Sequence, residues 1–208
     1  MAIKVYSLKK DGNKKLSSHF KVKEFRCKDA TDQILLNDQL VPLLEKLFAK
    51  LKCSTIIVNS GYRTNSYTVK VGGYVGDQHT KGNAADIRCN KNGKVIPAKE
   101  VCCALEELGH NGGVGYISST SVHVDVRGNK SWFDETNGKT RIASFKKYFG
   151  IVSDETYIRY TVKAGDSFWK IAREQMGSGL KCTELASFNG LKLTSVIRPG
   201  QVLKIPKK

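Results

Sequence analysis

The sequence contains no apolar run close to the roughly 20 residues that a membrane-spanning helix requires. The first ten residues do not resemble a secretory leader, because they carry charge but have neither an apolar centre nor a small-residue cleavage site, so we expect no signal peptide. We therefore expect no stable insertion into a membrane. We also expect synthesis in the cytoplasm of a host cell without a signal peptide, with any exit by another route.

Paired cysteine motifs are missing as well. The 6 cysteines form no CxxC pair and no zinc-knuckle spacing. Together with the expected absence of a signal peptide, this predicts reduced and mostly buried thiols. A metal site made only of cysteines is not expected.

No nucleic-acid-binding motif accompanies the high positive charge. Lysine and arginine number 35 against 19 acidic residues, which gives a formal charge of +16. Such a charge favours an anionic partner, whether nucleic acid, a membrane surface or a phosphate-bearing bacterial wall. The basic residues are spread along the chain without a groove-reading or base-stacking motif. We therefore expect a polyanionic partner other than nucleic acid.

The sequence does contain a set of metal-binding residue types. His79 and Asp86 lie seven residues apart in a segment rich in glycine and alanine, and His123 follows later. Two imidazoles and one carboxylate suit zinc and leave a fourth position free for water, as in hydrolytic zinc sites. The predicted cofactor is Zn²⁺, held by His79, Asp86 and His123.

The segment around His123 strengthens this prediction. Residues 121–127 alternate, so that three valines face one side of a strand and Ser121, His123, Asp125 and Arg127 face the other. A solvated edge strand does not need this pattern, which therefore favours His123 as a ligand. Asp125 has two alternative roles, as the general base or as a carboxylate that orients a ligand imidazole. Neither His19 nor His110 lies in an alternating pattern of this kind. His19 is interpreted as a surface or core-edge residue and His110 as a surface residue.

Hydrophobic periodicity predicts an α+β fold. Residues 32–51 have a helical period, as one helix or two with a break near residues 39–41 caused by Pro42. A helix is also expected over residues 97–108, with Pro97 near its first turn and Gly109 just past its end. Strands are expected at residues 54–59, 84–89, 112–117 and 121–127.

One ordered set of residues resembles a known family. The pattern His79-x-x-Gly82-x-Ala84-x-Asp86, followed by Ser121-x-His123, resembles the zinc peptidase family of D-alanyl-D-alanine carboxypeptidases and phage endolysins. The resemblance is strongest over residues 16–133 and closest to the small bacterial and phage branch. It implies a Hedgehog/DD-peptidase-like zinc domain over residues 1–150, which cuts peptidoglycan peptides.

The resemblance also implies roles around the metal. Arg63 corresponds to the family arginine that stabilises oxyanion charge or holds a substrate carboxylate, and Gln78 can donate a further hydrogen bond. The sequence departs from the family at two points. Asp77 stands where the family usually has serine. Thr120 and Ser121 stand where many relatives carry a carboxylate or a histidine, so the usual general base is missing from its usual place.

The C-terminal residues 159–206 resemble a LysM module, after a linker predicted at residues 151–158. The matching segments are residues 160–172, 185–191 and 197–206. The resemblance implies a small βααβ domain that binds glycan containing N-acetylglucosamine, in peptidoglycan or chitin. The residues expected at the glycan are Gly165, Asp166, Ser167, Asn189, Gly190 and Leu191.

Together these resemblances imply a phage- or prophage-type endolysin that acts at the bacterial cell wall. It would hydrolyse an amide bond in the peptide stem or cross-link of peptidoglycan and be targeted by its LysM domain. The expected partner is peptidoglycan, both peptide stem and glycan, and the expected state is a monomer. Three alternatives stay open: a D,D-carboxypeptidase that trims D-alanine, a wall-binding or signalling protein whose metal site is catalytically weak, and a nucleic-acid binder suggested by charge alone.

Overall fold

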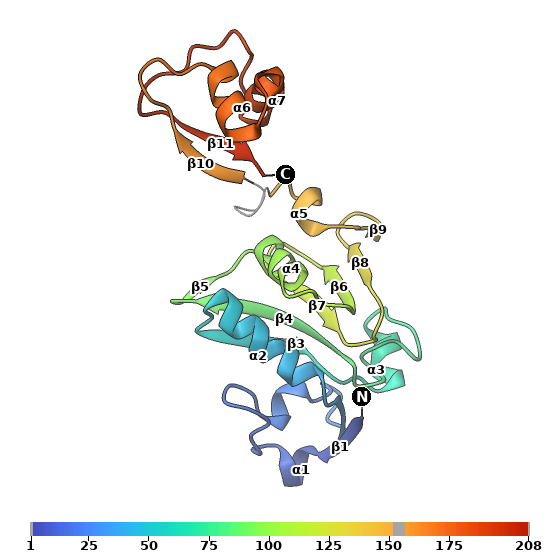
Figure 1. Cartoon of the computed structure of the whole chain (residues 1–208). Helices are drawn as coiled ribbons and strands as arrows, with labels where there is room; N and C mark the ends of the chain where they lie inside the picture. The colour runs from blue at the N-terminus through green and yellow to red at the C-terminus, as the bar shows by residue number, and fades with distance from the viewer. Residues whose placement is uncertain (1, 152–156, 208) are drawn as a thin grey trace. The chain divides into compact units, whose positions relative to one another are not determined.

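The structure, a computed structural model, describes residues 2–151 and 157–207 (Figure 1). The chain divides into two compact units, Met1–Phe149 and Gly150–Lys208. Most of the linker predicted at residues 151–158 lies outside the described residues. Within the described ranges, no helix combines the length and the apolar character needed to cross a membrane.

The first unit is built around a mixed, 7-stranded sheet. Its strand order is β3-β4-β7-β6-β8-β9, with β5 beside β4, and every pair is antiparallel except β6–β8. The strands are β3 (Thr55–Ser60), β4 (Ala84–Lys91), β5 (Lys94–Val95), β6 (Gly113–Tyr116), β7 (Val122–Asp125), β8 (Ser131–Asp134) and β9 (Thr140–Arg141). Mixed helix and sheet agree with the predicted α+β class.

Two longer helices, α2 (Leu40–Leu51) and α4 (Ala98–Glu107), pack on the sheet and against each other (Figure 1). The core beneath them contains fully buried Leu44, Leu105 and Val124. As predicted, α4 begins after Pro97 and ends before Gly109, whose φ is +65°. Shorter helical segments occupy the connections: α1 (Leu8–Asp11), η1 (Val22–Phe25), α3 (Asn65–Lys70) and α5 (Phe145–Tyr148).

The prediction of a helix starting at residue 32 is wrong for its first part. Gln33–Asn37 forms strand β2, which pairs antiparallel with β1 (Ile3–Ser7). A run such as Ile34–Leu36 fits a helix or a strand equally well, and the pairing with β1 decides between them. The Asn37 side chain then accepts a hydrogen bond from the backbone N–H of Gln39 at 3.0 Å, just before α2. Pro42 lies in the first turn of α2, where its missing N–H has no helical partner to lose.

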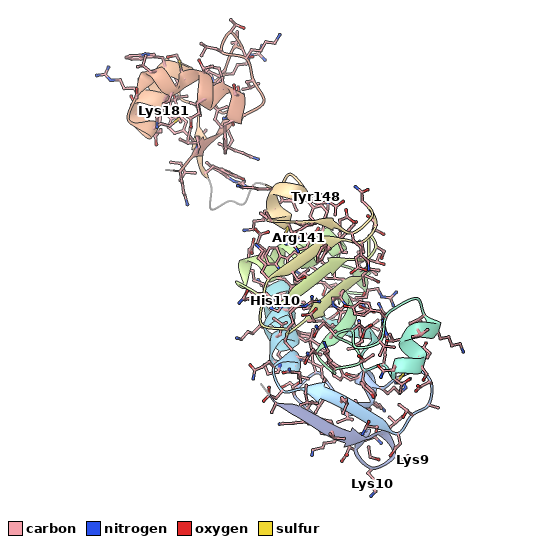
Figure 2. All side chains as sticks on the ribbon, turned by 90° about the vertical axis from the view of Figure 1, so that its right-hand side faces the viewer. Lys9, Lys10, His110, Arg141, Tyr148 and Lys181 are labelled. Atoms are coloured by element: carbon pink, nitrogen blue, oxygen red, sulfur yellow. The ribbon has the colours of Figure 1, made fainter. Side chains whose placement is uncertain are left out.

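Part of the positive charge is carried on the surface of this first unit. Lys9 and Lys10 of α1 are exposed and project outward (Figure 2). Lysine side chains in folded proteins are mostly exposed, because burying an unpaired charge is costly.

The second unit has the βααβ order predicted for a LysM module. Strands β10 (Tyr157–Thr161) and β11 (Val202–Pro206) pair antiparallel, and helices α6 (Phe168–Met176) and α7 (Cys182–Phe188) lie between them in sequence. A short 3₁₀ segment, η3 (Gly179–Lys181), joins the helices. The core of the second unit is formed by Val162, Phe168, Ile171, Ala172, Met176, Leu185, Ala186, Leu203 and Ile205.

All six cysteines are free thiols, and five of them are buried. Burial raises the pKa of the Cys103 thiol to about 11, with smaller contributions from the neighbouring Glu106 carboxylate. The Cys103 thiol therefore stays protonated, and the buried cysteines act as small apolar core residues.

Candidate metal centre

The face of the sheet away from α2 and α4 carries one row of residues across five strands. Asp86 of β4 is paired with His123 of β7, and Ser60 of β3 is paired with Asp86. Gly115 of β6 is paired with His123 on its other side, and Phe133 of β8 with Gly115. Directly paired residues project to the same face of a sheet, so these residues lie side by side. The row from Asp86 to Phe133 lines a cavity of about 570 Å³.

His79 reaches the row from the loop that precedes β4. The Asp77 carboxylate accepts from the backbone N–H of Thr80, and its carbonyl accepts from the Thr80 hydroxyl, both at 2.9 Å. The side-chain carbonyl of Gln78 accepts from the Asn83 amide, also at 2.9 Å. These bonds close the loop and hold His79, which is 4% exposed, at the edge of the cavity.

Gly82 packs this loop against strand β2. Its carbonyl accepts from the backbone N–H of Asn37 at 2.8 Å, and a Cβ at this position would lie 2.6 Å from the backbone of Leu35. The φ of Gly82 is +71°, which also favours glycine. Gly93 has a similar φ of +75° but open space around it.

The substitution Gly82→Ala is therefore expected to destabilise the protein more than Gly93→Ala does. Both substitutions place alanine at positive φ, so the comparison isolates the steric clash with Leu35. Overpacking of this kind lowers the free energy of unfolding by about 1–3 kcal/mol. Denaturant unfolding followed by circular dichroism measures the difference. Equal losses in the two variants would contradict this close packing.

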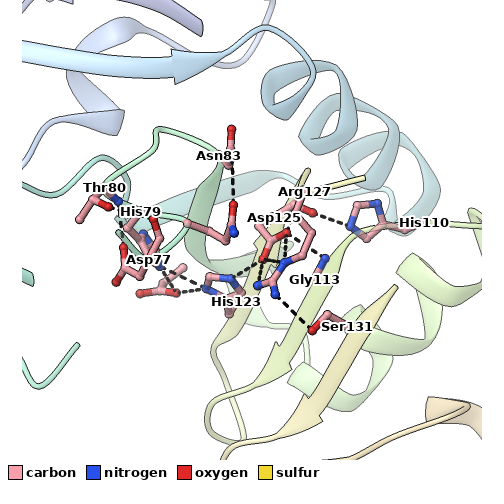
Figure 3. Close-up of polar contacts among 12 residues, drawn as sticks. Asp77, His79, Thr80, Asn83, His110, Gly113, His123, Asp125, Arg127 and Ser131 are labelled. Atoms are coloured by element: carbon pink, nitrogen blue, oxygen red, sulfur yellow. Dashed lines mark hydrogen bonds and ion pairs between the residues drawn. The ribbon is translucent and has the colours of Figure 1, made fainter. Parts of the chain in front are cut away.

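Three potential ligand atoms converge beside the cavity. His79 Nε2 lies 3.1 Å from His123 Nδ1, and Asp86 Oδ1 lies 3.2 Å from the first nitrogen and 3.1 Å from the second. In Figure 3 the two imidazoles point toward each other. Ligands at about 2.0–2.1 Å from a tetrahedral zinc ion are separated by about 3.3 Å, so the spacing fits. The structure thus brings together the three predicted ligands as a group that can hold a metal ion.

Hydrogen bonds on the far sides of the two rings make the near nitrogens the ones that can bind a metal ion, once His123 has released its second proton. His79 Nδ1 lies 2.8 Å from the carbonyl oxygen of Gly61, which only accepts, so Nδ1 carries the hydrogen. His123 Nε2 lies 3.1 Å from Asp125 Oδ2 and donates to it in the same way. Two lone pairs and one carboxylate oxygen then face each other, an arrangement that needs a positive charge between them. The donor set fits zinc.

The pKa values also show that the site attracts positive charge. Burial alone would lower the pKa of His123, but hydrogen bonds with Asp125 and Asp86 raise it to about 9. Burial opposes ionisation of Asp86, yet hydrogen bonds to His123 and His79 hold its pKa well below its usual range. A cation that binds here takes the place of the second proton on His123, so metal binding releases a proton.

Arg63 lies beside the ligands and supports Asp86. Its Nη2 donates to Asp86 Oδ2 at 2.5 Å, and its Nε donates to the Ser60 hydroxyl at 2.8 Å. Asp86 therefore presents Oδ1 to the histidines and Oδ2 to the guanidinium. Arg63 also lines the cavity, and its Nη1 donates no hydrogen bond within the described residues.

Asp125 lies behind His123, on the opposite side of the ring from the three converging atoms (Figure 3). Its carboxylate is fully buried and accepts from the backbone of Gly113 at 3.0 Å and from Arg127 Nη2 at 2.5 Å. A Cβ on Gly113 would lie 2.0 Å from Asp125 Oδ2, so glycine allows this approach. Burial opposes ionisation, but hydrogen bonds from His123 and Arg127 hold the pKa of Asp125 far below its usual range. This position favours the orienting role over the general base.

Two other histidines have definite places. His110, expected at the surface, is instead half-buried, and its Nε2 lies 2.9 Å from the carbonyl oxygen of Asp125. Burial lowers the pKa of His110. His19 pairs with Glu45 at 2.7 Å and stacks on Phe48, outside the cavity. The supporting role of His110 was missed because only the tertiary fold brings the loop after α4 to the end of β7.

Several of the residues predicted for glycan binding hold the second unit together. Asp166 accepts from the Tyr160 hydroxyl and the Lys163 backbone, both at 2.8 Å, and Ser167 caps α6. The Asn189 side chain bonds the backbone of Lys204 in both directions, at 2.8 and 2.7 Å. Gly165 and Gly190 have positive φ, and Leu191 packs on the core. Asp166 and Ser167 also line a cavity of about 530 Å³. The part of all six in glycan binding stays a prediction.

Comparisons with known proteins agree with this architecture. A family model described as Peptidase M15 matches residues 18–125, and one described as LysM domain matches residues 160–206. An uncharacterized protein of Deinococcus radiodurans is 43% identical over 47 residues, which are 23% of this chain and 19% of that protein. The chain thus spans about a fifth of the length of this curated relative. No solved structure matches the chain significantly.

Proposed function

Since the chain belongs to the peptidase M15 family and carries a C-terminal LysM domain, we propose that it is a zinc-dependent hydrolase of bacterial peptidoglycan. It cuts an amide bond in the peptide stem or cross-link, and its LysM domain binds the glycan of the same polymer. This combination is that of an endolysin of the phage or prophage type. The observation that carries the proposal is the group of three ligand atoms at 3.1–3.2 Å, open to a cavity of about 570 Å³.

The ligands in this proposal are His79, Asp86 and His123. A zinc ion bound there supplies a Lewis acid for the scissile carbonyl and lowers the pKa of a water molecule. The protein residues set the geometry: Gly61 orients His79, Asp125 orients His123, and Arg63 orients Asp86. Ligands whose second polar atom is fixed in this way hold a metal more tightly.

Two residues at the cavity wall are suited to hold the substrate. The Nη1 group of Arg63 stabilises negative charge on the carbonyl oxygen or binds a substrate carboxylate. Gln78 lines the cavity with its side-chain carbonyl already bonded to Asn83, so its amide nitrogen is the group left to donate. Arg127 also lines the cavity. Two guanidinium groups that line the same cavity suit a terminal carboxylate, which supports D,D-carboxypeptidase activity as the second candidate.

Digestion of purified peptidoglycan, followed by mass analysis of the products, tests the proposal. Zinc-loaded protein is expected to release peptide fragments with new N-termini, and a chelator is expected to prevent this. Free D-alanine as the sole product would identify the carboxypeptidase. Wall binding without any product, at full zinc loading, would reject hydrolysis and leave a glycan-binding protein.

A further inference from the structure

Amide hydrolysis needs a group that takes a proton from the attacking water. Three carboxylates near the cavity are unsuited to this task. Asp86 belongs to the ligand group, and Asp125 is fully buried behind His123. Asp77 is 8% exposed and accepts from the backbone of Thr80 at 2.9 Å. Among the described residues that line the cavity, Glu135 is the remaining carboxylate.

Strand β8 brings Glu135 to the same face as His123. Phe133 is paired with Gly115, which is itself paired with His123. Glu135 follows Phe133 by two residues, and its backbone N–H donates to the carbonyl of Tyr116 at 3.0 Å, so the pairing with β6 continues past the end of β8. Glu135 begins the turn that follows β8, and its carboxylate lies over Gly115, a member of the row.

Gly115 makes room for this side chain. A Cβ on Gly115 would lie 2.3 Å from Glu135 Oε1 and 3.1 Å from the Cβ of His123. The Glu135 carboxylate therefore lies over the backbone of Gly115, which has no side chain and is paired with the proposed ligand His123. Within the described part of the chain, Glu135 makes no hydrogen bond or ion pair through its side chain, and it is exposed. Its oxygens are free to accept from a water or a substrate.

The neighbours of Glu135 fix its backbone. Asp134 points to the other face, where it is 5% exposed. It accepts from the backbone N–H of Thr136 at 2.8 Å and from the hydroxyl of Tyr148 at 2.7 Å. These bonds tie the residues on both sides of Glu135 to the folded unit, and Tyr148 belongs to α5. A placed but unpaired carboxylate is what proton transfer requires.

We propose that Glu135 is the general base of this centre, an assignment that rests on the proposed hydrolysis. An O–H bond of the attacking water breaks, its proton passes to a Glu135 oxygen, and the water oxygen bonds to the scissile carbonyl carbon. The C–N bond then breaks, and Glu135 returns the proton to the leaving nitrogen. The carboxylate is regenerated, and no other reactant is needed.

The test compares Glu135→Gln with Glu100→Gln in the full chain. Glu100 is an exposed glutamate on α4, outside the cavity, so its variant is the matched control. For Glu135→Gln we expect kcat to fall about 100-fold or more, as for loss of a general base. Zinc content by metal analysis, and the Kd of zinc-free protein for an uncleaved stem peptide, should both match those of the wild type. Glu135→Asp, which keeps a base with a shorter reach, should recover part of kcat.

The outcomes separate this inference from the proposed function. If the wild type releases products and Glu135→Gln retains at least half of its kcat, the assignment of Glu135 is overturned while the hydrolase stands. Loss of zinc or of peptide binding in Glu135→Gln also overturns it, because the residue would then support binding instead of proton transfer. If the zinc-loaded wild type releases nothing, the proposed function itself fails.

Discussion

Replacing His79 by alanine is expected to abolish stoichiometric zinc binding and to lower hydrolysis of peptidoglycan peptides by about 1000-fold. The variant keeps only two of the three ligand atoms, His123 Nδ1 and Asp86 Oδ1, which is fewer than catalytic zinc sites use. A lost metal ion removes several kcal/mol of transition-state stabilisation, and each 1.36 kcal/mol is tenfold in rate. Metal analysis after dialysis and a peptide-release assay measure the two effects.

The matched control is His19→Ala, because His19 pairs with Glu45 and lies outside the cavity. This variant should keep wild-type zinc content and activity. Retention on insoluble peptidoglycan should be the same for both variants, since the LysM domain is a separate compact unit. Full activity of the His79 variant, or equal zinc loss in the His19 variant, would contradict the proposed centre.

Removing the Asp125 side chain is expected to have the second largest effect. In Asp125→Ala the guanidinium of Arg127 and the backbone N–H of Gly113 lose their acceptor in a fully buried position. Breaking a buried ion pair from one side costs about 3 kcal/mol or more, a large part of the stability of a small domain. His123 also loses the bond that orients it, so zinc affinity should fall about 10- to 100-fold.

This variant decides between the two roles of Asp125. If Asp125 orients His123, excess zinc should restore most of the turnover in the folded fraction of the variant. If Asp125 were the base, the variant would stay inactive with zinc fully bound. Asp32→Ala serves as the control. The exposed Asp32 also accepts two hydrogen bonds, from Ser7 and Lys9, but it is not among the residues that line the cavity. Its unfolding free energy and zinc affinity should change little.

The architecture explains how so small a unit can hold such a centre. Two of the proposed ligands come from strands of one sheet, where register sets their spacing, and the base candidate directly follows the end of β8. The third ligand comes from a loop closed by its own side chains, and its carbonyl accepts from the backbone N–H of Arg63 at 3.3 Å. A centre placed on rigid strands and completed by one braced loop needs little rearrangement when metal binds.

Local patterns in the sequence determined much of this picture. Alternation of valines and polar residues in 121–127 predicted the strand and the face of His123, and Pro97 and Gly109 marked the ends of α4. The order of elements in residues 157–206 followed from the LysM resemblance. These features depend on periodicity and on residues close in sequence, which is why they can be recognised without a structure.

Tertiary structure alone decided the rest. Strand β2 replaced the expected start of a helix because β1 pairs with it. Arg63 proved to bond the predicted ligand Asp86, His110 to bond Asp125, and Glu135 to reach the cavity from the turn after β8, twelve residues beyond His123. Each of these depends on which strands lie side by side and in what register. Register is set by packing of the whole sheet, a non-local quantity that no single stretch of sequence contains.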